Sequence, residues 1–152
     1  MIPPLEGNVL PQDIHDCTVE ECATVFGGFL RSDHRPRLTE RLRRYVADAT
    51  SAGIAVAVLV DGSYVTAKPE PSDIDLILVL KPDFDLSAEM RPMEYNVQSK
   101  RTVRKLYGLD VLPAVEGSDA YEEYLGLFSQ IRRDDPEQES ARPAKGLLRI
   151  EL

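Results

Sequence analysis

Two continuous runs of apolar residues stand out along the chain, at residues 54–60 and 74–80. Both runs are short, rich in branched side chains and bounded by turn-forming residues, which is typical of strands covered on both faces of a sheet. Helical spacing of apolar residues predicts a long helix over residues 36–52 and amphipathic helices over residues 18–26 and 118–131. We therefore expect an α/β (α+β) fold, a mixed β-sheet flanked by helices.

The segments between these elements carry weaker patterns. Residues 1–17 are rich in proline and lack periodicity, which predicts an extended N-terminal arm laid over the domain or against a partner. Residues 87–107 predict a turn of helix, a break before Pro92 and then a longer helix. Residues 146–152 predict an edge strand, and the charged, proline-bearing residues 134–144 predict a loop.

Length and charge narrow the possible functions. With 152 residues and no internal repeat, the chain is expected to form a single domain, residues 1–152. A formal net charge of −8 makes a nucleic-acid partner unlikely, because nucleic-acid binders usually present a basic surface. No apolar run is long enough to cross a bilayer and the start lacks the features of a signal peptide, so we expect no membrane contact and a cytoplasmic location.

Two aspartates open the second apolar run. Asp73 and Asp75 are two positions apart, and this spacing places both carboxylates on one side of a strand while Ile74 and Leu76 turn into the core. Neighbouring carboxylates repel each other and raise each other's pKa. A divalent cation, Mg²⁺ or Mn²⁺, is the simplest reason to keep such a pair at the start of a buried strand.

A Gly-Ser pair follows the first apolar run. Gly62 has no Cβ, so it can adopt positive φ and let the backbone approach a ligand closely. The N–H and hydroxyl groups of Ser63 then offer donors for phosphate oxygens. Either motif alone is common in ordinary turns and strand ends, but the two together, each beside a buried strand, indicate a site for a nucleotide and a metal ion.

This combination resembles the signature of the DNA polymerase beta-type nucleotidyltransferase superfamily, in which Gly-Ser is followed by a short spacer and then by Asp, an apolar residue and a second acid. Here nine residues separate Ser63 from Asp73. The chain looks most like the small single-domain bacterial members, which include the antitoxin-type minimal nucleotidyltransferases. The resemblance covers roughly residues 38–115, and it implies a nucleotidyltransferase-like sheet and a third acid on a later strand, for which Asp110 is the candidate.

The resemblance assigns roles to seven residues. It implies that Asp73, Asp75 and Asp110 hold the metal ions and carry the catalysis. It implies that the nucleotide is bound by the four residues Gly62, Ser63, Lys68 and Ser72.

Three features leave alternatives open. Lys68 either holds a phosphate, where related proteins use arginine, or is simply solvated. The basic residues 100–105 either compensate a helix dipole or contact a triphosphate or partner. Cys17, Cys22 and His15 suggest a metal site, but no second ligand cluster follows, so Cys22 is expected to pack on a helix face.

Two functions follow from these observations. The first is a metal-dependent transfer of a nucleoside monophosphate from ATP or another nucleoside triphosphate to a protein or small-molecule hydroxyl. The second is a catalytically weak or inactive binding module, an antitoxin-like partner of another protein. The three acids favour the enzyme. The polar Asp61 at an apolar position of the signature, the lack of an Arg-Gly segment and the acidic composition favour the binding module.

Overall fold

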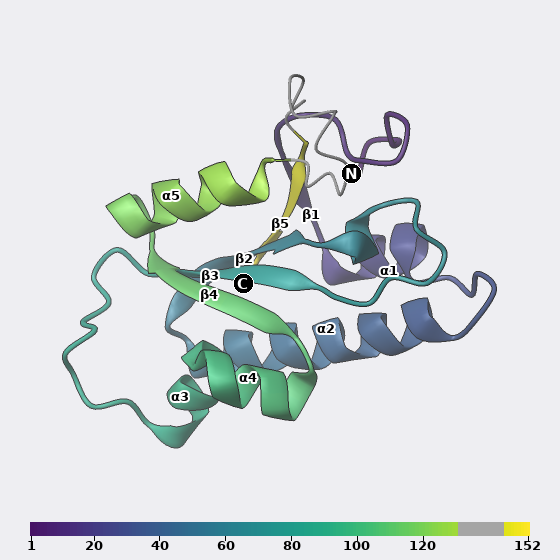
Figure 1. Ribbon diagram of the computed structural model, residues 1–152. Coiled ribbons are helices and arrows are strands. Elements are labelled where there is room, and N and C mark those ends of the chain that lie inside the picture. The colour runs from purple at the N-terminus through teal and green to yellow at the C-terminus, as the bar shows by residue number, and fades with distance from the viewer. Residues whose placement is uncertain (131–144) are drawn as a thin grey trace.

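The computed structural model describes residues 1–130 and 145–152 and shows a mixed α/β fold, as predicted (Figure 1). A five-stranded sheet has the strand order β1-β5-β2-β3-β4. The strands are β1 Ile14–Cys17, β2 Ala55–Asp61, β3 Asp75–Leu80, β4 Asp110–Val115 and β5 Leu147–Glu151. The helices are α1 Val19–Phe26, α2 His34–Ala52, α3 Pro92–Gln98, α4 Lys100–Tyr107 and α5 Asp119–Phe128, with a 3-10 turn η1 at Ser63–Val65. Strands β1 and β5, and strands β3 and β4, pair in parallel, while β2 is antiparallel to both of its neighbours.

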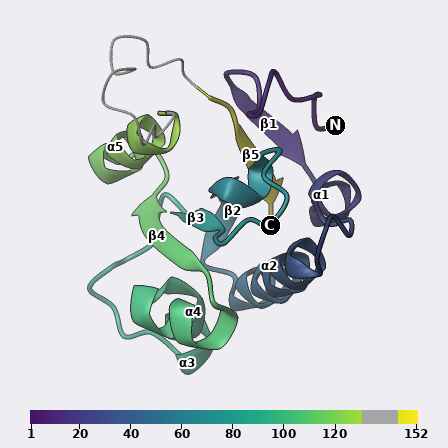
Figure 2. The ribbon, with the colours of Figure 1, turned by 45° about the vertical axis from the view of Figure 1, so that its right-hand side comes forward.

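The two faces of the sheet are covered unequally. Helices α1 to α4 lie on one face and α5 lies on the other (Figures 1 and 2). Along β3, Leu76 and Leu78 face the larger core, and Ile77 and Val79 pack in a smaller cluster with Phe128 and other side chains of α5. All four strand residues are buried, which confirms the expectation that the continuous apolar runs are strands covered on both sides.

The predicted helix starts agree with the local hydrogen bonds. Thr18 and Glu21 form the expected capping box: the Glu21 N–H donates to Thr18 Oγ1 at 3.1 Å, and the Thr18 N–H donates to Glu21 Oε2 at 2.8 Å. Cys22 is fully buried on the inner face of this helix, as expected, and its Sγ lies 3.5 Å from Sγ of Cys17. Helix α2 begins at His34, slightly before its predicted start at residue 36.

The position of the last strand was predicted wrongly. Strand β5 is not at the edge, because it lies between β1 and β2. Leu147 and Leu148 are both buried, so this strand has apolar side chains on both faces, as a central strand requires. The edge is formed instead by residues 14–17, which end the predicted arm and pair along β5. The residues before them include a turn between the bridged residues Glu6 and Val9, and Leu10 is buried against the core.

The helical segment before β4 also differs from the prediction. Residues 87–90 form no helix, and the break falls at Ser99, between α3 and α4. Ser99 has extended φ and ψ, and its Oγ accepts a hydrogen bond from the N–H of Thr102, so it begins a new helix. The predicted loop at residues 134–144 and the end of the predicted final helix at Ile131 lie outside the described residues. In the part of the chain that is described, no helix is long and apolar enough to cross a membrane.

Candidate functional site

Three aspartates form a row across neighbouring strands. Asp61 is the cross-strand partner of Asp75, and Asp75 is the partner of Asp110. Directly opposed residues of paired strands project to the same face of a sheet. Since Leu76 and Val111 belong to the core on the other face, the three carboxylates lie on the face that carries α5. Asp75 and Asp110, the candidate third acid, therefore share one face, and Asp61 adds a fourth acid to the site.

Asp73 lies just before β3 and is held by the Gly-Ser turn. Its Oδ1 accepts hydrogen bonds from the N–H of Ser63 at 3.1 Å and from the Ser63 hydroxyl at 2.6 Å. The same hydroxyl accepts from the N–H of Ser72 at 3.2 Å. Gly62 has φ +95°, the positive value that its sequence position suggested. The two Ser63 donors that were expected to bind phosphate are thus directed at Asp73 in this structure.

Two adjoining cavities bring the predicted site residues together. A cavity of about 390 Å³ extends from the Gly-Ser turn to the aspartates, and a second of about 370 Å³ continues from the aspartates to β4. Phe128 of α5 lines both cavities, as do Asp73 and Asp75. The first also contains Gly62, Ser63, Lys68, Ser72, Asp61 and Lys145, and the second contains Asp110 and Lys100.

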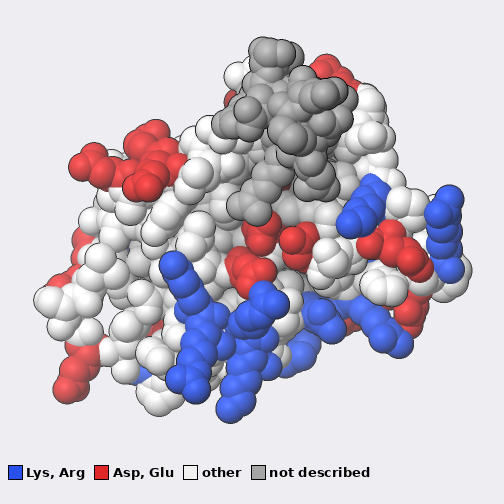
Figure 3. All heavy atoms as spheres, in the orientation of Figure 1, with Lys and Arg blue, Asp and Glu red and all other residues white. Residues whose placement is uncertain are grey.

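Positive charge lies next to these acids. Lys145 Nζ is 2.6 Å from Asp61 Oδ1, and both side chains are largely buried. Arg104 pairs with Asp110 through Nη1 and Oδ1, and the carboxylate raises the pKa of the guanidinium. On the surface, Figure 3 shows acidic side chains gathered in the middle of one face, with Lys and Arg side chains below them in the region of α4. One of the basic residues in 100–105 therefore contacts a predicted site residue directly.

The segment that follows the Gly-Ser turn is held by a buried arginine, Arg35, which was not among the predicted site residues. Arg35 is only 4% exposed, and burial lowers its pKa. Its Nη1 donates to the carbonyl oxygens of Phe26 at 3.1 Å and Tyr64 at 2.8 Å, and its Nη2 donates to those of Thr66 at 2.7 Å and Lys68. Arg35 therefore fixes the backbone conformation of the segment that contains Lys68.

The row of Asp61, Asp75 and Asp110 offers carboxylate oxygens as possible ligands for Mg²⁺. Carboxylate oxygens are the ligands that Mg²⁺ prefers, and Asp75 is flanked on both sides by a further acid. The residues present therefore fit the ion in the chemistry of their donor atoms. The side chains of Asp73 and Asp110 are directed at Ser63 and Arg104, and within residues 1–130 and 145–152 no group of three His, Cys, Asp or Glu side chains is arranged to hold a metal ion.

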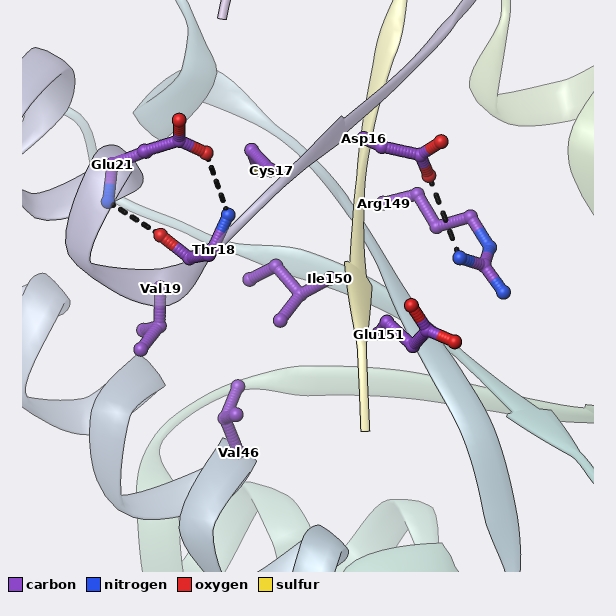
Figure 4. Close-up of a pocket in the computed structure, with 9 residues that line it drawn as sticks. All are labelled: Asp16, Cys17, Thr18, Val19, Glu21, Val46, Arg149, Ile150 and Glu151. Atoms are coloured by element: carbon purple, nitrogen blue, oxygen red, sulfur yellow. Dashed lines mark hydrogen bonds and ion pairs between the residues drawn. The ribbon is translucent and has the colours of Figure 1, made fainter. Parts of the chain in front are cut away.

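A separate cavity of about 460 Å³ lies between the edge of the sheet and α1 (Figure 4). It contains none of the predicted site residues. Four of its polar side chains are used within the fold: Thr18 and Glu21 form the capping box, and Arg149 pairs with Asp16 at 3.4 Å. The cavity is therefore a gap between β1, β5 and α1, and the candidate site is the acid-lined pair of cavities.

Replacing Gly62 by alanine should destabilise the protein by about 2–3 kcal/mol, since both a strained φ and a steric conflict would result. A Cβ at this position would lie 3.1 Å from Asp73 O and 3.1 Å from Asp75 N. Gly117→Ala is the matched control, because Gly117 has φ +75° and no atom within 4 Å of the added carbon. Urea denaturation should show a larger loss for Gly62→Ala than for Gly117→Ala, and equal losses would contradict the close approach.

Comparison with known proteins identifies the family of this chain, and the function of that family is unknown. A family model described as "Family of unknown function (DUF6932)" matches residues 3–151. No curated protein and no solved structure matches the chain.

Proposed function

We propose that this chain, which belongs to the DUF6932 family, is a metal-dependent nucleotidyltransferase that moves a nucleoside monophosphate from ATP or another nucleoside triphosphate to a hydroxyl group. The observation that supports the proposal best is the row of Asp61, Asp75 and Asp110. Asp75 lines both the cavity that contains the Gly62-Ser63 turn and the cavity that contains Asp110. Asp75 has an acid on each side in this row, and such a concentration of carboxylates in a pocket that also contains lysine side chains favours a role in binding and catalysis.

In the proposed reaction, residues of both cavities take part. An oxygen of the acceptor hydroxyl bonds to the α-phosphorus, the bond from that phosphorus to the bridging oxygen breaks, and pyrophosphate leaves with the bonding electrons. The hydroxyl proton passes to Asp110 or to solvent. Asp110 lies on the edge strand β4, and its side chain is 46% exposed, so both routes are open. In the proposed complex the N–H and hydroxyl groups of Ser63, which donate to Asp73 in this structure, turn to phosphate oxygens beside Gly62. Lys68 and Ser72 line the same cavity.

The metal ions would be held by Asp73, Asp75 and Asp110. When bound, Mg²⁺ or Mn²⁺ neutralises phosphate charge that the acidic cleft would otherwise repel. Arg104 is mostly exposed, so its pair with Asp110 can be exchanged for another partner at little cost in stability. The acceptor, a protein or a small molecule, approaches from the side of β4 and α4, where Lys100 also lines the cavity.

A second candidate function is a binding module that resembles the antitoxin-type members and holds a protein partner. One observation favours it. The acids are engaged by groups of the protein itself: Asp73 by Ser63, Asp110 by Arg104 and Asp61 by Lys145. In a binding module these contacts would persist, and the row would serve the stability of the fold rather than a reaction.

Transfer of label from α-labelled ATP separates the two functions. With Mg²⁺ present, the protein is expected to label an acceptor in a lysate of its native host and to release one pyrophosphate for each nucleotide transferred. Each of the other three nucleoside triphosphates is tested in parallel, because the residues do not select a base. If no nucleotide is transferred or bound, the enzyme proposal is wrong and the binding module is favoured.

A further inference from the structure

Lys145 places a fixed positive charge inside the candidate site. Its side chain is 14% exposed and that of its partner Asp61 is 7% exposed, with 2.6 Å between Nζ and Oδ1. Both line the cavity that contains the Gly-Ser turn and Asp75. A charge in such a position acts more strongly than one in water, because the surrounding dielectric constant is lower.

Three backbone hydrogen bonds fix the segment that carries this lysine. The N–H of Lys145 donates to Ser129 O at 2.9 Å, that of Gly146 donates to Leu10 O at 3.0 Å, and that of Leu147 donates to Asp13 O at 3.0 Å. Residue 146 leaves no room for a side chain, since a Cβ there would lie 2.0 Å from Pro11 O. The N-terminal residues and the end of α5 thus hold Lys145 in place at the start of β5.

The other lysines of the two cavities are held less firmly. Lys68, which the sequence analysis selected, and Lys100 are both exposed. Lys145 is the least exposed of the three and is anchored by an ion pair as well as by its backbone. A triphosphate that enters this acidic cleft needs a nearby positive charge, and Lys145 is the best placed to supply it.

The order of the strands indicates which phosphates Lys145 faces. Asp110 lies on β4 and Asp75 on β3, while Asp61 lies on β2 and Lys145 precedes β5. Lys145 and Asp110 are therefore at opposite ends of the row. Phosphoryl transfer places the attacking and leaving oxygens roughly in line, on opposite sides of the phosphorus. With the acceptor at Asp110, the leaving pyrophosphate lies toward Lys145.

We propose that Lys145 binds the β- and γ-phosphates of the nucleoside triphosphate, and that Asp61 is a positioning residue that holds the ammonium group in the cleft. This inference rests on the proposed nucleotidyltransferase function. An ammonium group has three donors and Asp61 accepts from one, so the pair can be kept while phosphate oxygens are bound. A buried ion pair adds little net stability over apolar residues, which favours a role in binding.

Equilibrium binding of ATP, ADP, AMP and inorganic pyrophosphate tests the inference. In buffer with Mg²⁺, Lys145→Met should weaken the binding of ATP and of pyrophosphate at least about tenfold, the loss expected for one charge-assisted hydrogen bond. AMP, which lacks both outer phosphates, should bind the variant with less than about a twofold change on the same scale. Lys81→Met, which removes an exposed lysine beyond the far end of β3, should leave all four affinities unchanged.

Because Lys145→Met removes the ion-pair partner of the buried Asp61, the double variant Asp61→Asn, Lys145→Met is measured as well. It should recover the melting temperature but not the affinity for pyrophosphate. If the double variant binds ATP as tightly as the wild type, or loses AMP and ATP affinity equally, the role of Lys145 is wrong and the proposed function stands. If the wild-type protein binds no nucleoside triphosphate, the proposed function itself fails.

Discussion

Asp75→Asn is expected to lower nucleotide transfer by about a thousandfold, because a metal ion supplies several kcal/mol of charge stabilisation and each ~1.4 kcal/mol is a factor of ten. Asp75 is the centre of the site: it has an acidic cross-strand partner on each side and lines both cavities. Asparagine keeps the size of the side chain and removes its negative charge, so the variant reports on the charge at this position.

The measurement combines activity with thermal shift. Mg²⁺ and ATP at one hundred times the dissociation constant should stabilise the wild type by ~2.7 kcal/mol, and Asp75→Asn should lose most of this gain. Asp83→Asn makes the same chemical change at an exposed position after β3 and should behave like the wild type. Equal shifts in wild type and Asp75→Asn would exclude the metal site. Asp73→Asn is a poorer probe, because it also alters an acceptor of two Ser63 hydrogen bonds.

Arg35→Met is expected to cost about 3–4 kcal/mol of the free energy of unfolding, since it leaves several buried carbonyl oxygens without their donor. Four backbone carbonyls accept from this one guanidinium, and three of them belong to the segment from Tyr64 to Lys68. Amide hydrogen exchange in residues 62–68 should rise more than elsewhere, because Arg35 joins this segment to α2.

Arg37→Met provides the matched control for this experiment. Arg37 lies on the same helix, but its side chain is 72% exposed and forms an ion pair with Asp33. Exposed pairs of this kind contribute about 0–1 kcal/mol, so denaturant unfolding should hardly change. If Arg35→Met were as mild as Arg37→Met, or if exchange in residues 62–68 stayed at the wild-type rate, the guanidinium would not determine the conformation of the turn.

The sequence predicts those parts of the fold whose signal is local. Ile74 and Leu76 face the core on either side of Asp75 because alternation is a property of the strand itself. The capping box at Thr18 likewise needs only four consecutive residues. The shared face of Asp75 and Asp110 depends on the parallel pairing of their strands, which local sequence patterns do not predict.

The missed features depend on residues far apart in the chain. The pairing of residues 14–17 is directed by the main chain of β5, and nothing in their own side-chain pattern indicates a strand. Lys145 has no motif around it, and only the fold brings it to Asp61. Arg35 did leave a signal, because it continues the buried stripe of Leu38 and Leu42 at helical spacing. A charged residue on an apolar stripe indicates buried partners, which here are backbone carbonyl oxygens, three of them in residues 64–68.

The central position of β5 has a consequence for the order of folding. Asp16 and Arg149 lie 133 positions apart in the chain, yet they sit on adjacent strands. Pairings of such long range form slowly, because closing the long loop between the two strands costs conformational entropy before any stabilising contact forms. Until β5 inserts, β2 exposes an unpaired edge and Lys145 cannot reach Asp61. Partly folded chains therefore lack the complete cleft, and completion of the sheet and assembly of the site become a single late event.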